Sequence, residues 1–220
     1  MTTSKNWEEL IASADEVLRR GNYDEACQLL EEAKSQAETF EPKDPRRVTG
    51  LHKLGNALAE AGRKEEAEAC HKRAVDLTVS CFGPYHQKVA DSTKELASLY
   101  FENGDYVKAE ELCRKMLNIY EKSLGIKHQE VGLVSRNLAM ILHQQNKLDE
   151  AEKYYKRALL ILQDVLNPFD SGLIGLMQSY AELLQLSGRE EEADHMIACA
   201  LGRVSGKMRS VTGAHLPEIS

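Results

Sequence analysis

The sequence repeats itself with a period of 42 residues, and this period constrains the fold more than any other feature. Five alanines mark one repeat position, at spacings of 41, 42, 42 and 42: Ala26, Ala67, Ala109, Ala151 and Ala193. Twelve residues before each of them stands a second small residue: Ala14, Gly55, Ala97, Ala139 and Ala181. Nine before stands a larger apolar residue: Val17, Leu58, Tyr100, Leu142 and Leu184. Columns in register over nearly the whole chain indicate five copies of one structural unit.

A further column shows how each unit is built. Five residues before each alanine stand Gly21, Gly62, Gly104, Asn146 and Gly188, residue types that end helices in the left-handed region. Acidic residues follow in four of the repeats, where they suit the first turn of a new helix. Each unit is therefore predicted to be a helix A, a tight turn and a helix B. Small residues let the two helices approach closely.

Composition and charge exclude several classes of protein. The net charge of −7 argues against a nucleic-acid binder, because phosphate neutralisation needs a basic surface. No stretch approaches the ~18 apolar residues that span a bilayer, and the N-terminal residues lack the apolar core of a secretion signal. The five cysteines are odd in number and form no CxxC pair, which favours free, buried thiols in a reducing compartment. We expect a cytoplasmic protein without nucleic-acid or membrane partners.

These columns resemble the tetratricopeptide repeat, which combines a small residue, a large residue, a glycine and an alanine at the same offsets. The second repeat matches with Leu54-Gly55, Leu58, Gly62, Ala67 and Ala74, and the fourth with Leu138-Ala139, Leu142, Ala151, Tyr155 and Ala158. The resemblance implies an all-α, right-handed solenoid of five antiparallel helix pairs. We expect it to occupy residues 1–205, followed by a C-terminal tail over 206–220 that is folded back, disordered or bound to another subunit. The repeats are expected at about 7–47, 48–88, 89–130, 131–172 and 173–205.

The unit is longer than the usual 34 residues, and its second helix lacks the usual terminal proline. Glu38, Val79, Glu121, Gln163 and Ser205 stand at that position, so helix B is expected to run on. The long unit, the Leu-Gly-Ile-Lys-His junction at 124–128 and the phrase Ala-Glu-Lys-Tyr-Tyr-Lys-Arg-Ala-Leu at 151–159 resemble the kinesin light chain subclass. Where that subclass has His-Pro, this chain has His86-Gln87 and His128-Gln129. The resemblance therefore concerns the geometry of the repeat.

The sequence carries no recognisable catalytic, cofactor or metal motif. The seven histidines form no HExxH motif and no cluster at metal-ligand spacing, and no phosphate-binding glycine loop or nucleophile elbow occurs. His86 and His128 recur at the same junction, which predicts local hydrogen bonding. We expect a protein that is not an enzyme and that needs no cofactor or metal.

Binding is expected on the concave wall that the A helices of a solenoid form. The candidate peptide-binding residues, read from A-helix positions that avoid the core, are His52, Asn56, Lys94, Phe101, Leu133, Arg136, Asn137, Met140, His143 and Gln178. Asn137 matches an asparagine that grips the backbone of an extended peptide in similar repeats. Cationic and apolar side chains in one groove predict a partner peptide that carries carboxylates and a large apolar anchor.

Two other functions fit the sequence. Apolar residues in the first repeat (Trp7, Leu10, Ile11, Leu18) and in the last helix (Met196, Ile197, Ala200, Leu201, Val204) would suit a scaffold that assembles end to end. A regulatory sensor, in which a bound peptide changes the curvature of the solenoid, would need a second chain as its output. We expect a monomer or a weak homo-oligomer.

Overall fold

The computed structural model describes residues 6–202, and over this range the chain forms ten α-helices and no strand. The helices are α1 (Trp7–Arg19), α2 (Tyr23–Ala37), α3 (Pro45–Glu60), α4 (Lys64–Phe82), α5 (Gln87–Glu102), α6 (Tyr106–Leu124), α7 (Gln129–Gln144), α8 (Leu148–Val165), α9 (Ser171–Leu186) and α10 (Glu190–Ala200). The expectation of an all-α chain of five helix pairs is confirmed. The contacts divide the chain after Asn103 into two compact units, which are described separately.

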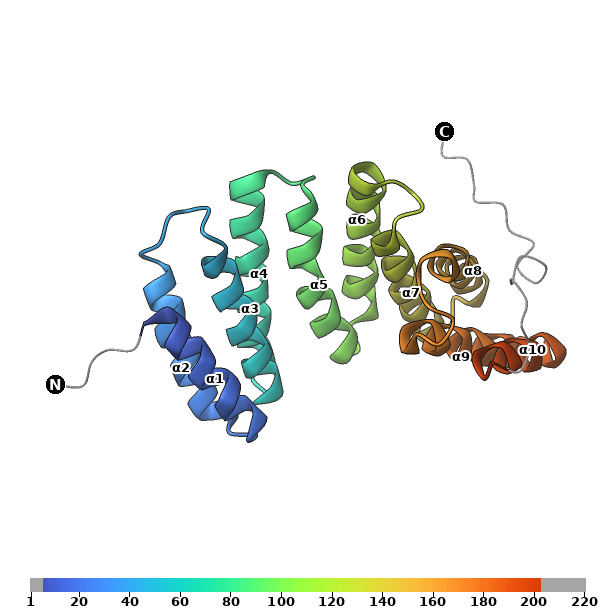
Figure 1. The fold of residues 1–220 in the computed structure, drawn as a ribbon, viewed down its shortest axis with the longest axis horizontal. Helices are drawn as coiled ribbons and strands as arrows, with labels where there is room; N and C mark the ends of the chain where they lie inside the picture. Colours follow the sequence, from blue (N-terminus) through green and yellow to red (C-terminus); the bar gives the residue numbers. More distant parts are fainter. Residues whose placement is uncertain (1–5, 203–220) are drawn as a thin grey trace. The chain divides into compact units, whose positions relative to one another are not determined.

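The first unit contains α1 to α5. Figure 1 shows α1 joined to α2, and α3 joined to α4, by a short turn. Each helix also packs on the next one along the chain, α2 on α3 and α4 on α5. The shared core brings Ala14, Leu30, Leu54, Leu58 and Ala67 together, all of them nearly inaccessible to solvent. The second unit, α6 to α10, is built in the same way, with α7 packed on α8 and α9 on α10.

The turns between paired helices have the predicted conformation. Gly21, Gly62, Gly104 and Gly188 have φ between 71° and 78°, and Asn146, at the equivalent position, has φ 58°. This is the left-handed region, which only glycine and, at some cost, asparagine enter readily. The acidic residues that follow lie in the first turns of α2, α4, α8 and α10, as expected.

In three repeats, helix B continues past the position where the usual repeat has a proline, as expected. The helices α4, α6 and α8 have 18 or 19 residues and run past Val79, Glu121 and Gln163. In contrast, α2 ends at Ala37, one residue before Glu38, and Ser205 lies outside the described residues. At the next junctions, His86 and His128 accept a hydrogen bond through Nδ1 from the backbone N–H two residues on, which confirms their predicted role. They act as N-caps of α5 and α7.

The apolar residues of the terminal repeats are mostly packed inside. Leu10, Met196 and Ala200 are buried, and Ile11 and Leu18 pack against the core of the first unit. Leu201 is 55% exposed. Val204 and the predicted tail, residues 206–220, lie outside the described residues. Within residues 6–202, no helix is both long enough and apolar enough to cross a bilayer.

Two glycines of α3 allow a test of the close packing between helices. A Cβ on Gly55 would lie 2.7 Å from Cε1 and Nε2 of His71, whereas a Cβ on Gly50 would meet its neighbours at an ordinary 3.9 Å. We expect Gly55→Ala to lower the free energy of unfolding by about 1–3 kcal/mol, because the buried imidazole must move. Gly50→Ala should raise it by roughly 0.5–1 kcal/mol through helix propensity. Urea unfolding followed by circular dichroism measures both, and equal effects of the two substitutions would contradict the packing argument.

Candidate functional site

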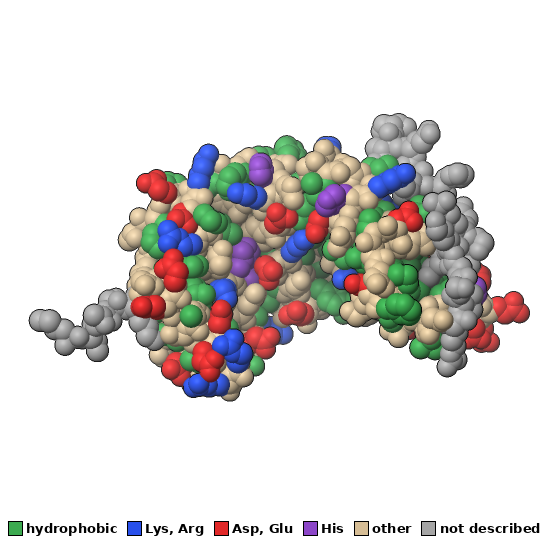
Figure 2. Space-filling view, in the orientation of Figure 1, with side chains coloured by type: hydrophobic (Ala, Val, Ile, Leu, Met, Phe, Trp, Pro, Cys, Tyr) green, Lys and Arg blue, Asp and Glu red, His purple; other side chains and the backbone are tan. Residues whose placement is uncertain are grey.

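Four of the predicted binding residues occupy the same repeat position, fifteen residues before the repeat alanine: His52, Lys94, Arg136 and Gln178. They lie on the A helices α3, α5, α7 and α9, the first two in the first unit and the last two in the second. None of the ten predicted residues is fully buried: Asn56, Asn137 and Gln178 are exposed and the others are partly buried. Their role in binding stays a prediction. In Figure 2, acidic and basic side chains are interspersed over the first unit.

In the first unit, His52 is the middle member of a hydrogen-bonded chain whose two ends are buried. Its Nδ1 lies 2.9 Å from Nδ1 of His71, and its Nε2 lies 2.8 Å from Oγ of Ser92. The two imidazole rings are stacked, with centroids 5.2 Å apart. His71 and Ser92 are 1% and 5% exposed. The chain thus joins α3, α4 and α5, and His52 is engaged inside the protein as well as being accessible from its surface.

Sequence reasoning missed this chain, although the repeat carries a signal for it. His71 stands four residues after Ala67, in a column that is otherwise Leu30, Cys113, Tyr155 and Ile197. Gly55 is the one glycine in the column that holds alanine in the other repeats, and it lies directly against His71. A polar residue at a repeat position that is otherwise apolar predicts a buried imidazole that needs a hydrogen-bond partner. The glycine at the repeat position that faces it indicates that the imidazole also needs space.

The electrostatics of the pair follow from its burial. Desolvation, together with the neighbouring His71, lowers the pKa of His52 to about 4. Desolvation also lowers the pKa of His71, while the Glu95 carboxylate opposes both effects. Glu95 itself accepts a hydrogen bond from Nδ2 of Asn56, another of the predicted residues. At neutral pH, both rings are therefore uncharged, and one Nδ1–H is shared between the facing nitrogens.

In the second unit, Arg136 has an unusual environment. Three arginines of this unit form ion pairs: Arg114 with Glu110 and Glu150, Arg157 with Glu121, and Arg189 with Glu152 and Glu192. Arg136 instead donates through Nε and Nη2 to Oδ1 of Asn137, at 3.4 and 3.3 Å. Its Nη1 lies beside Gly172, in the first turn of α9. Among the described residues, Arg136 has no carboxylate partner within ion-pair distance.

The other predicted residues of this unit surround Arg136 with apolar and polar groups. Leu133 and Met140, one turn before and one turn after it on α7, are both partly buried. His143 is tied to the core, since its Nδ1 lies 3.4 Å from the hydroxyl of Tyr155, whose ring stacks on Tyr180. Gln178 and Asn137 are exposed. The face of α7 thus offers a cation, an amide and two apolar side chains.

The potential metal ligands and the thiols are mostly dispersed or buried in residues 6–202. No group of three or more potential metal-ligating residues occurs within the described residues. All five cysteines are free thiols, of which Cys27 and Cys113 are buried. Burial raises the pKa of the thiols of Cys27, Cys70 and Cys199, and that of Cys113 to about 12. Raised values leave these thiols protonated and unreactive at neutral pH.

Comparison with known families agrees with this architecture. One family model described as tetratricopeptide repeat matches residues 14–78, 88–164 and 130–203, and a second matches residues 52–123. The chain belongs to the tetratricopeptide repeat family. The predicted resemblance, made from the repeat columns, is thereby confirmed.

Proteins of kinesin light chain type are among those to which this chain is similar. The chain is 28% identical over 102 residues to the protein KINESIN LIGHT CHAIN-RELATED 1 of Arabidopsis thaliana, and the match covers 43% of this chain but only 16% of that protein. The crystal structure of a putative kinesin light chain with nearly identical TPR-like repeats from Podosopora anserina has a TM-score of 0.73 at 23% identity, covering 89% of this chain and 93% of that one. BtubC (BKLC) from P. vanneervenii has a TM-score of 0.78 at 20% identity, covering 97% and 83%. These structures establish similarity of fold.

The histidine pair predicts a pH dependence of stability. Because both pKa values are lowered on folding, the unfolded chain binds more protons between pH 6.5 and about 4. The free energy of unfolding of the first unit should therefore fall, by roughly 1–3 kcal/mol, as the pH drops through this interval. Urea unfolding followed by fluorescence of Trp7, the single tryptophan, measures it. His52→Gln should make the dependence shallower, and parallel curves for the two proteins would contradict this origin.

Proposed function

We propose that this chain is a non-catalytic protein-binding module that holds an extended segment of a partner protein against the exposed faces of its A helices. The family supports protein–protein interaction as the general role. The preferred segment combines carboxylates with at least one large apolar side chain.

The observation that carries the proposal is the state of Arg136. A guanidinium that is partly buried loses hydration, and in proteins it usually recovers that loss by pairing with a carboxylate. The other described arginines of the second unit do so, whereas Arg136 makes, within residues 6–202, two long hydrogen bonds to a neighbouring amide. A carboxylate from a partner could accept two parallel hydrogen bonds from its planar fork. Leu133 and Met140, on the same face, would contact an apolar side chain of the same segment.

The first unit offers a similar but separate face. Lys94 occupies the position of Arg136 on α5, and Phe101 lies seven residues further along the same helix. Asn56 and His52, both on α3, are the predicted binding residues of the preceding A helix. Here the cation is an ammonium, which attracts a carboxylate as a point charge without fixing its orientation. We therefore expect Lys94 to contribute less selectivity than Arg136.

The proposal is tested with peptides selected from a displayed random library on the wild-type protein, then synthesised and measured by fluorescence anisotropy. We expect selected peptides to be acidic and to contain a large apolar residue. Arg136→Glu should weaken their binding by roughly tenfold to a hundredfold, because a charge-assisted hydrogen bond is replaced by repulsion. Arg136→Lys should recover part of the loss, since it restores the charge without the fork.

Lys153→Glu is the matched control, because Lys153 is exposed on α8 and the substitution changes the charge equally. Equal affinities for wild type and Arg136→Glu, or selected peptides without acidic residues, would refute the proposed face. Sedimentation at several concentrations tests the self-assembling alternative. A mass that rises with concentration and is suppressed by Leu201→Lys, at the exposed end of the last repeat, would favour that function instead.

A further inference from the structure

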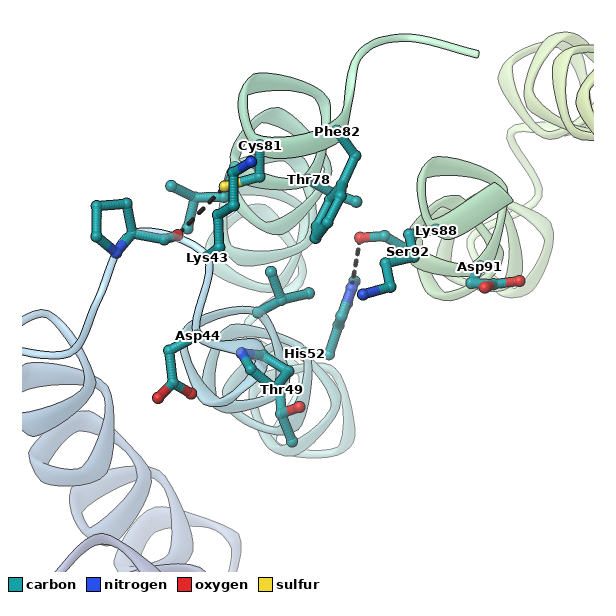
Figure 3. A pocket seen from close by; sticks show the side chains of 14 residues that line it. Lys43, Asp44, Thr49, His52, Thr78, Cys81, Phe82, Lys88, Asp91 and Ser92 are labelled. Atoms are coloured by element: carbon teal, nitrogen blue, oxygen red, sulfur yellow. Dashed lines mark hydrogen bonds between the residues drawn. The ribbon is translucent and has the colours of Figure 1, made fainter. Parts of the chain in front are cut away.

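The first unit contains a cavity of about 260 Å³ that opens at the surface (Figure 3). It is enclosed by the loop before α3 and by side chains of α3, α4 and α5. The thiol of Cys81, near the end of α4, donates to the carbonyl of Pro42 at 3.2 Å and so fixes the loop against that helix. Pockets for drug-sized ligands are usually about 300–1,000 Å³. The cavity therefore suits a short molecule.

The wall of the cavity is cationic on one side. The ammonium groups of Lys43 and Lys88 lie 5.9 and 4.3 Å from the centroid of the Phe82 ring, which they share. Among residues 6–202, neither ammonium forms an ion pair. Both lysines are exposed, so their ammonium groups stay hydrated at the rim of the cavity and are held there by the attraction of the ring face. Two ammonium groups near one ring thus place positive charge at the rim of the cavity, and no carboxylate of the described residues lies within ion-pair distance of either.

The two carboxylates that border the cavity do not neutralise this charge. Asp44 accepts hydrogen bonds from Nε and Nη2 of Arg46 and caps the first turn of α3. The Arg46 guanidinium holds the pKa of the Asp44 carboxyl below its usual range. In Figure 3, the carboxylates of Asp44 and Asp91 both point away from the cavity.

The inner wall combines an apolar surface with a built polar group. Val48, Leu77 and the ring of Phe82 supply the apolar part. His52 and Ser92 also line it, held in place by the hydrogen bond between Nε2 and Oγ (dashed in Figure 3). Ser92 is 5% exposed, so its position is fixed by packing. A ligand in this cavity would meet aliphatic surface along its length and ammonium groups at one end.

We infer that this cavity is a binding site for a short aliphatic chain that ends in an anionic group, such as a six-carbon carboxylate. The apolar end fills the space between Val48 and Leu77, and the anion lies near Lys43 and Lys88. The site lies in the first unit and does not involve Arg136. It shares His52 with the candidate face of the first unit, whereas Arg136, which carries the proposed function, is no part of it, so the tests at Lys88 and at Arg136 can fail separately.

Three probes with the same chain and different heads test the inference: hexanoate, hexanol and hexylamine. Binding to the intact chain is followed by NMR, through saturable shifts of the His52 ring-proton signal, which identify the cavity as the place of binding. We expect hexanoate to bind with a dissociation constant of about millimolar order, as its small size allows. Hexanol should bind about tenfold more weakly, and hexylamine should produce no saturable shift.

Lys88→Met should weaken hexanoate binding about fivefold to tenfold and leave hexanol unchanged, because only the charge is removed. Lys64→Met, on the exposed start of α4, is the matched control and should bind hexanoate like the wild type. Equal affinity for all three probes, no saturable shift with any of them, or an unchanged affinity of Lys88→Met would overturn the inference. Displacement of hexanoate by an acidic peptide would assign the anion to a partner's side chain, and lack of displacement would assign it to a free small molecule.

Discussion

The close approach of each A helix to its B helix is the constraint on which the rest of this structure depends. It is made at small residues: Ala26, Ala67, Ala109, Ala151 and Ala193 are all fully inaccessible to solvent. A methyl group is the largest side chain that such a crossing accepts, since the larger apolar residues fill the space on either side. The same short contact fixes where the neighbouring side chains of the A helices emerge. The candidate binding faces are therefore a consequence of the packing beneath them.

The second repeat departs from this rule and compensates for it. His71 brings a polar ring into a core column, and Gly55 gives up its side chain to make room. The cost of burying the imidazole is offset by its hydrogen bond to His52, which in turn is bonded to Ser92. As a result, His52 couples the exposed face of α3 to the core and borders the cavity beside Phe82. The first unit thus has a hydrogen-bonded connection between its surface and its interior. In the second unit, Tyr155 occupies the repeat position of His71, and its partner is His143.

Charge is distributed differently between the two kinds of helix in the second unit. The arginines of its B helices, and Arg189 at the start of α10, are bound to glutamates of neighbouring repeats, for example Arg114 to Glu150. Such partly buried ion pairs hold successive repeats in register. The charged groups that form them are therefore already paired within the protein. Arg136, on an A helix, has no carboxylate within ion-pair distance in the part of the chain that the structure describes. This asymmetry explains how a chain with a net charge of −7 can still present a cationic site.

The amino-acid sequence was sufficient for the repeat period, the helix pairs, the left-handed turns at Gly62 and Asn146, and the junction caps at His86 and His128. These features depend on residues close together in the chain, so each leaves a local pattern that recurs. The histidine chain left only a weak signal, a polar residue in an apolar column, and the environment of Arg136 left none. His52 meets His71 and Ser92 across 19 and 40 residues, and whether an arginine finds a glutamate depends on how two helices cross. Side-chain partners between helices are set by distances of a few ångströms, which arise only once the whole unit has packed.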